Sequence, residues 1–241
     1  MARPTRVDTE QELLSAIGAP PAGTRAIALV GGADNLAEGS RQPIAAFFRT
    51  LASALDEAHV ILVDGGTDSG IMRLVADARR ATGSRFRLVG VAPRGRIGKP
   101  TRTGTIVHLA KGHPELLLVP GEAFGDETPW LFRAADHLAG GCAPTLVVNG
   151  GRLTLGEAIR RLAEGAPVVV VRGSGRAADV LSRAGSANGR LGVPTADPAD
   201  DEFRPFEVDS VSTAHLRLVD LDVTVEDLIG ALGARPEGKT A

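Results

Sequence analysis

The amino-acid sequence predicts an α/β protein with a doubly wound, mainly parallel sheet between two layers of helices. Apolar runs rich in Val, Ile and Leu recur along the chain, and segments with helical spacing separate most of them. The runs are unbroken rather than alternating, which is typical of parallel strands buried on both faces. Their alternation with helices predicts right-handed crossovers. We expect strands at 26–30, 60–64, 88–92, 115–119, 145–149 and 167–171.

A short helix is expected ahead of the first strand. Thr9 and Glu12 have the spacing of a capping box, and Leu13, Leu14 and Ile17 follow at helical spacing. The Gly/Pro-rich segment from Gly18 onward then ends the helix. We therefore interpret residues 1–23 as an N-terminal helical extension.

Amphipathic helices are expected between the strands. The first has an apolar stripe and Pro43 in its first turn, which proline tolerates. The next spans 71–80, and a third follows Thr128 and Pro129, a cap residue with proline after it. The stripe residues of the first helix are Ile44, Phe47, Phe48, Leu51 and Leu55.

The later helices have recognisable start signals. Thr154 with Glu157 is a capping-box pattern for a helix that stops at Gly165, and a further helix is expected from Ser174 to about Arg183. The polar, Gly/Pro-rich stretch 185–205 is expected to be a surface loop.

A strand near 215–221 and a helix from Thr224 to Leu232 complete the predicted fold. No internal repeat or second-domain boundary is recognisable. We expect a single domain over 24–241, with its core at 24–184 and its C-terminal strand and helix at about 213–233.

The amino-acid composition excludes several classes of protein and makes others unexpected. The 241 residues are 43% hydrophobic, enough for a sizeable core, so disorder of the whole chain is excluded. One cysteine excludes an intramolecular disulfide framework. A net charge of −2 and 3% aromatic residues give no reason to expect nucleic-acid binding. No apolar run reaches the roughly 18–20 residues of a spanning helix, so we expect a cytoplasmic protein without membrane insertion.

Glycine-rich turns follow four of the predicted strands. Glycine lets backbone N–H groups approach a phosphate, and ligands of open α/β sheets bind beyond the carboxyl ends of the strands. The alternative is that tight strand-to-helix turns favour glycine for purely local reasons. Four turns at equivalent positions favour a ligand site. They read VGGADN (30–35), DGGTDSG (64–70), VNGG (148–151) and RGSGRAAD (172–179).

The sequence lacks the motifs of a Walker A loop, a nucleophile elbow and a metal site. Gly98-Lys99 has Pro93 where a Walker A loop needs glycine, and Ser174 has Arg172 where a nucleophile elbow needs glycine. The five histidines have no metal-ligand spacing, so no metal site is expected. Cys142 is interpreted as a small buried residue rather than a nucleophile.

The motifs, taken together in order, resemble a known family. The sequences GGADN, GGTDSGIM, GVAPRG, HPELLLVPG and VVVVRGSGRAADVL cover about 24–184. They resemble the LSDAT branch of the SLOG superfamily, found in the cytoplasmic N-terminus of melastatin-type TRP channels and in bacterial stand-alone proteins. The resemblance implies a Rossmann-like domain that binds a nucleotide derivative such as ADP-ribose or an NAD-derived molecule, with no cofactor beyond this ligand.

The resemblance also implies a set of ligand-binding residues. Two glycine turns form the walls of the site, and the last motif supplies backbone donors and a guanidinium. An acidic and a basic residue within GDETPWLFR (125–133) resemble the acidic and basic pair on the corresponding channel helix. Arginine forks can pair with phosphate. The implied residues are Gly31, Gly32, Asn35, Gly65, Gly66, Thr67, Gly70, Glu127, Arg133, Gly173, Ser174, Gly175 and Arg176.

Several residues have alternative interpretations. The less favoured alternative for Arg133 and Arg176 is surface salt bridging, and Glu127 can simply stabilise a helix N-terminus. His113 is expected to be structural. Asp34, Asp64 and Asp68 are expected to face away from phosphates, to contact ribose or to hold a cation. The basic segment 94–102 is either a solvated loop, which we favour, or a lid over an anionic ligand.

The function implied by the resemblance is a ligand sensor, because the phosphoribohydrolase motif of the superfamily is degraded here. The matching stretch begins at Pro120 and keeps Glu127, but lacks the second glycine and the threonine. The alternatives are a nucleotide N-glycosidic hydrolase that uses Glu127 in the same pocket, and a scaffold with a relict pocket. A sensor implies a separately encoded effector, and a homo-oligomer is compatible with the superfamily.

Overall fold

An eight-stranded, all-parallel sheet forms the centre of the protein. The structure, a computed structural model, describes residues 3–32, 38–101, 103–185, 190–191 and 211–233. The predicted α/β architecture is confirmed, and each of the predicted strands is present. The strands of this sheet are β1 (Thr5–Arg6), β2 (Arg25–Gly31), β3 (Val60–Asp64), β4 (Leu88–Pro93), β5 (Glu115–Val119), β6 (Thr145–Val148), β7 (Val168–Arg172) and β10 (Leu216–Asp220).

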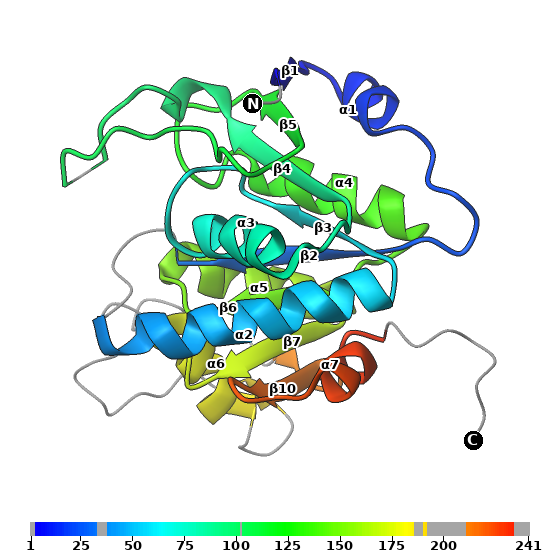
Figure 1. Ribbon diagram of the computed structural model, residues 1–241, viewed down its shortest axis with the longest axis vertical. Helices are drawn as coiled ribbons and strands as arrows, with labels where there is room; N and C mark the ends of the chain where they lie inside the picture. Colours follow the sequence, from blue (N-terminus) through cyan, green and yellow to red (C-terminus); the bar gives the residue numbers. More distant parts are fainter. Residues whose placement is uncertain (1–2, 33–37, 102, 186–189, 192–210, 234–241) are drawn as a thin grey trace.

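The strands from β2 onward are added first on one side of β2 and then on the other. The order is β1-β5-β4-β3-β2-β6-β7-β10, so the chain steps outward from β2 to β5 and then crosses back to place β6 on the other side of β2 (Figure 1). In open α/β sheets the crevice at such a switch point, outside the carboxyl ends of the strands, is where ligands bind. The fold therefore places the expected site between β2 and β6.

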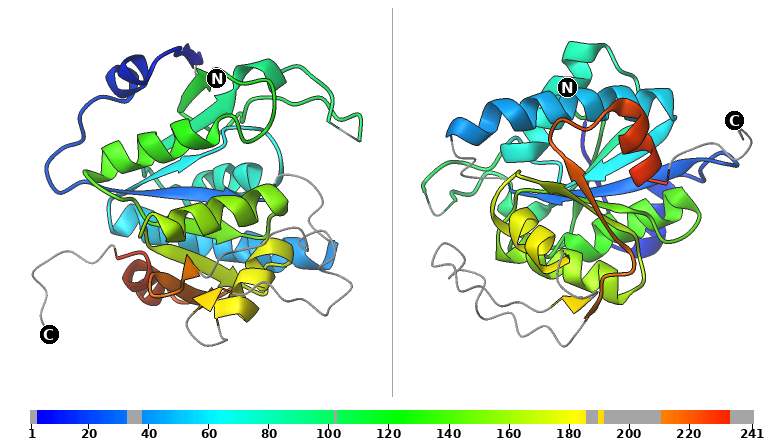
Figure 2. Two further views of the ribbon diagram at one scale, coloured as in Figure 1. Left: turned by 180° about the vertical axis from the view of Figure 1, so that it is seen from behind. Right: turned by 90° about the horizontal axis from the view of Figure 1, so that it is seen from below.

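Helices cover both faces of the sheet (Figures 1 and 2). Because side chains alternate along β2, Ile27 and Leu29 pack toward one helical layer while Ala28 and Val30 pack toward the other. Both layers are closed by apolar side chains, as expected for a parallel sheet. One layer contains α2 (Glu38–Glu57), α3 (Gly70–Thr82) and α7 (Val225–Ala231), and the other contains α1 (Glu10–Ile17), α4 (Thr128–Ala139), α5 (Arg152–Ala163) and α6 (Arg176–Gly185).

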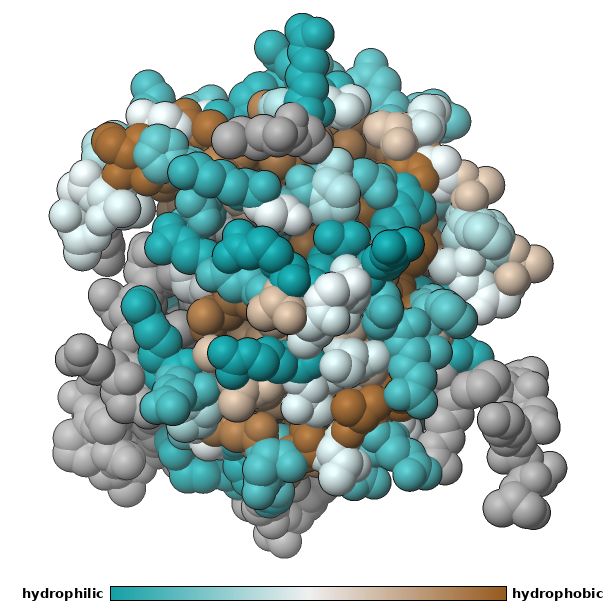
Figure 3. Space-filling view, viewed as in Figure 1, coloured by the Kyte–Doolittle hydropathy of each residue, from teal (hydrophilic) through white to brown (hydrophobic). Residues whose placement is uncertain are grey.

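The helix stripes predicted from the sequence point into the core. The five stripe residues of α2 are fully buried. The hydroxyl of Thr9 accepts from Glu12 N–H in the predicted capping box of α1. However, α2 begins at Glu38, so Pro43 lies inside the helix rather than in its first turn. Figure 3 shows that the outer face, where α2 and α3 lie, is mostly hydrophilic, with apolar side chains confined to small patches.

The predicted start of α5 at Thr154 was wrong, whereas α6 begins close to the expected position near Ser174. The turn after β6 ends at Gly151, so α5 begins at Arg152, and Thr154 lies in its first turn instead of capping it. The hydroxyl of Ser174 donates to the carbonyl of Val171 and accepts from Asn149 N–H, which keeps Ser174 in the turn before α6. Both helices begin two residues away from the sequence-based position.

The ends of the chain add short strands that the sequence pattern did not predict. β1 pairs in parallel with β5, so part of the N-terminal extension belongs to the sheet. β8 (Arg190–Leu191) pairs antiparallel with β9 (Val211–Ser212), and the rest of the predicted loop 185–205 beyond Gly185 lies outside the described residues. Residues Arg94–Arg96 form a single 3-10 turn. None of the described helices is both long and apolar enough to cross a membrane.

Candidate functional site

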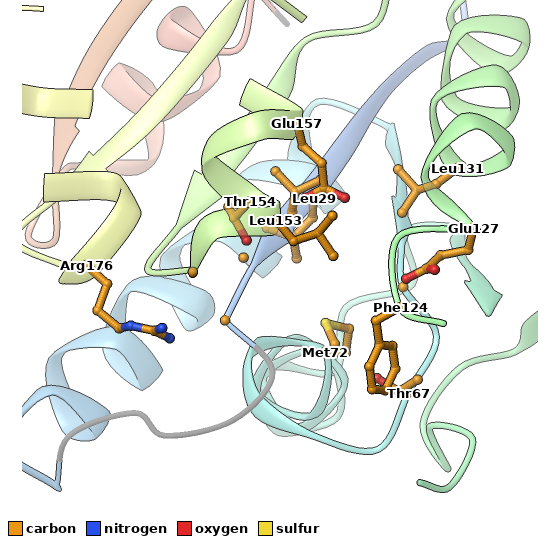
Figure 4. A pocket seen from close by; sticks show the side chains of 15 residues that line it. Leu29, Thr67, Met72, Phe124, Glu127, Leu131, Leu153, Thr154, Glu157 and Arg176 are labelled. Carbon is orange, nitrogen blue, oxygen red and sulfur yellow. The ribbon is translucent and has the colours of Figure 1, made fainter. Parts of the chain in front are cut away.

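A cavity of about 300 Å³ lies beyond the carboxyl ends of β2 and β3, at the switch point of the sheet (Figure 4). Its walls come from the turns after β2, β3 and β6, from the first turns of α5 and α6, and from the loop and helix after β5. This volume lies at the lower end of the range of small-molecule sites. The lining residues are Leu29, Val30, Gly31, Gly32, Gly65, Thr67, Met72, Phe124, Glu127, Leu131, Gly151, Leu153, Thr154, Glu157 and Arg176.

Gly31 and Gly32 bring the end of β2 unusually close to the turn after β6. A Cβ on Gly31 would lie 2.0 Å from the carbonyl oxygen of Val148, and one on Gly32 would lie 2.6 Å from Oδ1 of Asn149. The carbonyl of Gly32 also accepts from Ile71 N–H, which holds the start of α3 against this turn. Both predicted residues line the cavity. Larger residues at these positions would separate β2 from β6.

A buried pair of side chains, Asp64 and His113, holds the turn after β3 in place. Nε2 of His113 lies 2.8 Å from both carboxylate oxygens of Asp64, and both side chains are fully buried. The Gly66 N–H donates to Oδ1 of Asp64 at 2.8 Å. His113 therefore stabilises this turn, which is the structural role expected of it. Asp64 points away from the cavity, whereas Gly65 and Thr67 line it.

Two other predicted glycines serve the shape of this turn instead of lining the cavity. Gly66 has φ +61°, and a Cβ there would lie 3.0 Å from the backbone of Gly90. Gly70 begins α3 with φ +47°. Asp68, whose position we had left open, pairs with Arg73 at the surface.

The turn after β7 packs against the turn after β6. Asn149 donates through Nδ2 to the carbonyl of Ser174 at 2.7 Å, and a Cβ on Gly175 would lie 2.9 Å from this amide nitrogen. The Gly173 N–H donates to Asp179 Oδ1 at the start of α6. Gly173, Ser174 and Gly175 are thus occupied by contacts within the protein, and they do not line the cavity as the motif had suggested.

Arg176 is the residue of this motif that reaches the cavity. It has φ +51°, and its guanidinium lies against Gly151, where a Cβ would be 3.0 Å from Nη2. Gly151 therefore makes room for the Arg176 side chain. Figure 4 shows this side chain extending into one side of the cavity.

Glu127 lines the opposite side of the cavity (Figure 4). It immediately precedes α4, is 9% exposed, and accepts from Gly125 N–H through Oε2 at 2.7 Å. Burial raises the pKa of the Glu127 carboxyl, although backbone N–H groups that donate to it oppose the shift. The structure thus brings the acidic residue of the resemblance to the site.

Glu157 is a second acidic residue in the cavity, and the sequence analysis missed its place there. Thr128 donates its hydroxyl proton to Oε1 of Glu157 at 2.5 Å. Burial raises the pKa of Glu157 to about 7, and the neighbouring Glu127 carboxylate adds to this shift. The sequence signal was misread as a capping box with Thr154, since the carboxyl reaches across to α4 instead.

Arg133 and Asn35 do not join these residues in the described structure. Arg133 lies on α4 with a 44% exposed side chain, and its Nε makes a salt bridge to Glu10 of α1. This surface salt bridge is the alternative interpretation of Arg133, which does not line the cavity. Asn35, together with Asp34, lies outside the described residues.

Apolar side chains complete the cavity, and these too were absent from the predicted set. Phe124 and Leu153 line the cavity and are 39% and 46% exposed. Arg96 of the basic segment 94–102 lies over the Phe124 ring at 5.1 Å. This segment therefore approaches the rim of the cavity through one cation–π contact.

The described residues hold no group of three or more His, Cys, Asp or Glu that could bind a metal ion. Cys142 is exposed in the turn before β6, so its interpretation as a buried residue was wrong. The chemistry of the cavity therefore comes from one guanidinium, two carboxyl groups, two threonine hydroxyls, glycine backbone and apolar walls.

Comparison with known proteins identifies the family and the fold. A family model described as the SLOG domain in TRPM, prokaryotic form, matches residues 25–228. TM1055, a structural-genomics target solved by X-ray crystallography, is 18% identical with a TM-score of 0.55, covering 88% of this chain and 99% of its own. The molybdenum cofactor binding protein of Rippkaea orientalis is 12% identical with a TM-score of 0.53, covering 89% and 98%. No curated protein sequence matches the chain significantly.

Proposed function

The chain belongs to the prokaryotic family of SLOG domains related to those of TRPM channels, and from this premise we propose that its cavity binds a nucleotide derivative of the ADP-ribose type. The proposal depends on one observation: the cavity lies at the switch point between β2 and β6, where glycine turns and Arg176 meet. Nucleotide ligands of doubly wound sheets occupy this position.

The side of the cavity near Arg176 is suited to phosphate groups. The cavity is lined by Gly151, which caps α5, and by Arg176, the first residue of α6, and it includes Thr67 shortly before α3. The positive ends of these helix dipoles favour an anion. Each charge-assisted hydrogen bond from the Arg176 guanidinium to phosphate would contribute about 1.5–3 kcal/mol. Gly31, Gly32 and Gly65 allow the ligand to approach the backbone closely.

Calorimetric titration tests this proposal directly. ADP-ribose, cyclic ADP-ribose, NAD and AMP are titrated separately into the folded protein, and at least one should bind with a saturable heat. Absence of binding by all four at millimolar concentration would contradict the proposal. Molybdenum cofactor is a useful further ligand, because the Rippkaea protein with the same fold is named for binding it.

A hydrolase that acts in the same cavity is the second candidate function. It is favoured by the buried carboxyl groups of Glu127 and Glu157, since a carboxyl group with a raised pKa is suited to general acid catalysis. Incubation with AMP or ADP-ribose, followed by chromatography for released base or ribose phosphate, distinguishes the two functions. If Glu127→Gln loses turnover and keeps binding, the chain is an enzyme. Binding without turnover by the wild type would contradict the hydrolase.

As a sensor, the domain would act through a separate effector protein or through self-association. Pull-down with and without ADP-ribose, followed by mass spectrometry and sedimentation of the same samples, tests both. A partner or oligomer whose amount changes with ligand supports the sensor, whereas identical results in both samples support a scaffold with a relict pocket.

A further inference from the structure

The cavity has a strongly uneven distribution of charge. Arg176 lies on one side, and the two carboxyl groups of Glu127 and Glu157 lie away from it on the walls formed by α4 and α5 (Figure 4). An anionic ligand group is attracted to the first side and repelled by the second. A ligand with a phosphate end and an uncharged polar end can therefore enter in one orientation.

Glu157 is held so that one oxygen of its carboxyl group is used and the other is available. Thr128 donates to Oε1. No other group in the described ranges donates to this carboxyl group. Because the cavity contacts Glu157 directly, a ligand is the natural donor or acceptor for Oε2.

The groups that face Glu157 come from two places, the start of α4 and α5 itself. Glu127 and Thr128 face it from the start of α4. On α5 itself, Arg152 and Arg160 line a second cavity of about 390 Å³, of which Glu157 and Leu153 form a shared wall with the first. Arg160 pairs with Glu164, so its charge is already neutralised by a carboxylate.

We propose that Glu157 and Glu127 form a hydroxyl-binding subsite that holds the ribose end of the ligand, opposite a phosphate-binding end at Arg176. The proposal rests on the nucleotide-binding function above and adds to it an orientation and a residue that the family motifs do not include. A sugar with two neighbouring hydroxyl groups both donates and accepts hydrogen bonds. A carboxyl group that holds a proton can donate a hydrogen bond, and every carboxyl group can accept one, so the pair can serve both hydroxyl groups.

The protonation of Glu157 supports the pairing of these carboxyl groups with ribose hydroxyl groups. With its pKa near 7, Glu157 carries a proton in a large fraction of molecules at neutral pH, while the neighbouring carboxyl is an acceptor. Above this pH both carboxyl groups are ionised, and they lose the shared donor and repel the phosphates of the ligand. Affinity for ADP-ribose should therefore fall roughly 3–10-fold between pH 6 and pH 8.

The test compares three ligands with the full-length chain and three variants. ADP-ribose, ribose 5-phosphate and inorganic pyrophosphate are titrated into wild type, Glu157→Gln, Thr128→Val and Glu57→Gln. Glu57→Gln is the matched control, because it removes an exposed carboxylate from the end of α2, outside the cavity. Glu157→Gln should weaken both sugar ligands roughly 5–20-fold and change pyrophosphate affinity less than twofold. Thr128→Val should have the same pattern with a smaller loss.

The pH dependence provides a second readout that a structural role would not change. Glu157→Gln should abolish the decrease in ADP-ribose affinity between pH 6 and 8, whereas Glu57→Gln should keep it. An equal change for all three ligands, or no change for the sugar ligands, would overturn the subsite. Failure of wild type to bind any nucleotide would instead overturn the nucleotide-binding function itself.

Discussion

The turns after β3 and β7 are both rich in glycine, yet they have different partners. In the first, Gly65 and Thr67 face the cavity while Asp64 and His113 hold the turn from below. In the second, Gly175 and its neighbours pack against Asn149 in the turn after β6. Glycine in a strand-to-helix turn therefore indicates that something approaches closely, but not whether a ligand or another turn does so.

The largest expected effect comes from the buried anchor of the first turn. Asp64→Ala should lower the free energy of unfolding by about 3–5 kcal/mol, because it leaves buried His113 without its carboxylate and Gly66 N–H without its acceptor. Urea denaturation followed by circular dichroism measures this. Asp220→Ala is the control, since it breaks a half-exposed ion pair with Arg172 and should cost less than about 1 kcal/mol. Equal losses would show that the buried pair is no special anchor.

Alanine at one glycine of each turn sharpens the comparison. Gly175→Ala should destabilise the fold by about 1–3 kcal/mol, since Gly175 has φ +97° and the new Cβ would lie 2.9 Å from Asn149 Nδ2. Gly65→Ala should change stability by less than about 0.5 kcal/mol, because the nearest atom to its Cβ is 3.8 Å away on Met72.

For ADP-ribose affinity, the order of the two variants should be reversed: Gly65→Ala should have the larger effect. The methyl group of Gly65→Ala projects into the cavity and should weaken ADP-ribose binding several-fold, whereas folded Gly175→Ala should bind nearly as wild type. Thermal denaturation and calorimetry on both variants measure the pair of effects. If Gly175→Ala is the variant that loses affinity, the turn after β7 contacts the ligand and the assignment of the two turns is reversed.

The fold should also have a pH-dependent stability. The pKa of Glu157 is raised in the folded state to about 7, so the folded protein binds this proton more tightly than the unfolded chain. The stabilisation is complete below the unfolded pKa and is lost as pH rises toward 7. Glu157→Gln should therefore remove roughly 1–2 kcal/mol of the decrease in unfolding free energy between pH 5 and pH 8. Urea denaturation at both pH values tests it, and an unchanged pH profile would contradict the buried position of the carboxyl group.

The sequence was sufficient for the fold because strand and helix signals are local. Unbroken apolar runs such as Val168–Val171 and the stripe of α2 report burial directly. The two-residue β1 was missed because its pairing with β5 depends on a partner more than 100 residues away along the chain. The start of α5 was missed because Gly151, not Thr154, ends the preceding turn.

The site was predictable only where backbone position determines it. Glycines at the end of β2 must lie at the switch point, so Gly31 and Gly32 were found. Side-chain direction depends on tertiary packing: Arg133 points to Glu10 on α1, while Glu157, taken for a helix cap, points into the cavity. A motif residue and a ligand-facing residue are therefore different predictions.

The central claim is that the cavity binds a nucleotide derivative through Arg176, and a matched pair of arginine variants tests it most directly. ADP-ribose is titrated calorimetrically into wild type, Arg176→Ala and Arg133→Ala, the latter being an exposed arginine outside the cavity. We expect saturable binding by wild type, a roughly 10–100-fold loss of affinity in Arg176→Ala, and no significant change in Arg133→Ala. Equal affinity in all three proteins, or a loss confined to Arg133→Ala, would contradict the claim.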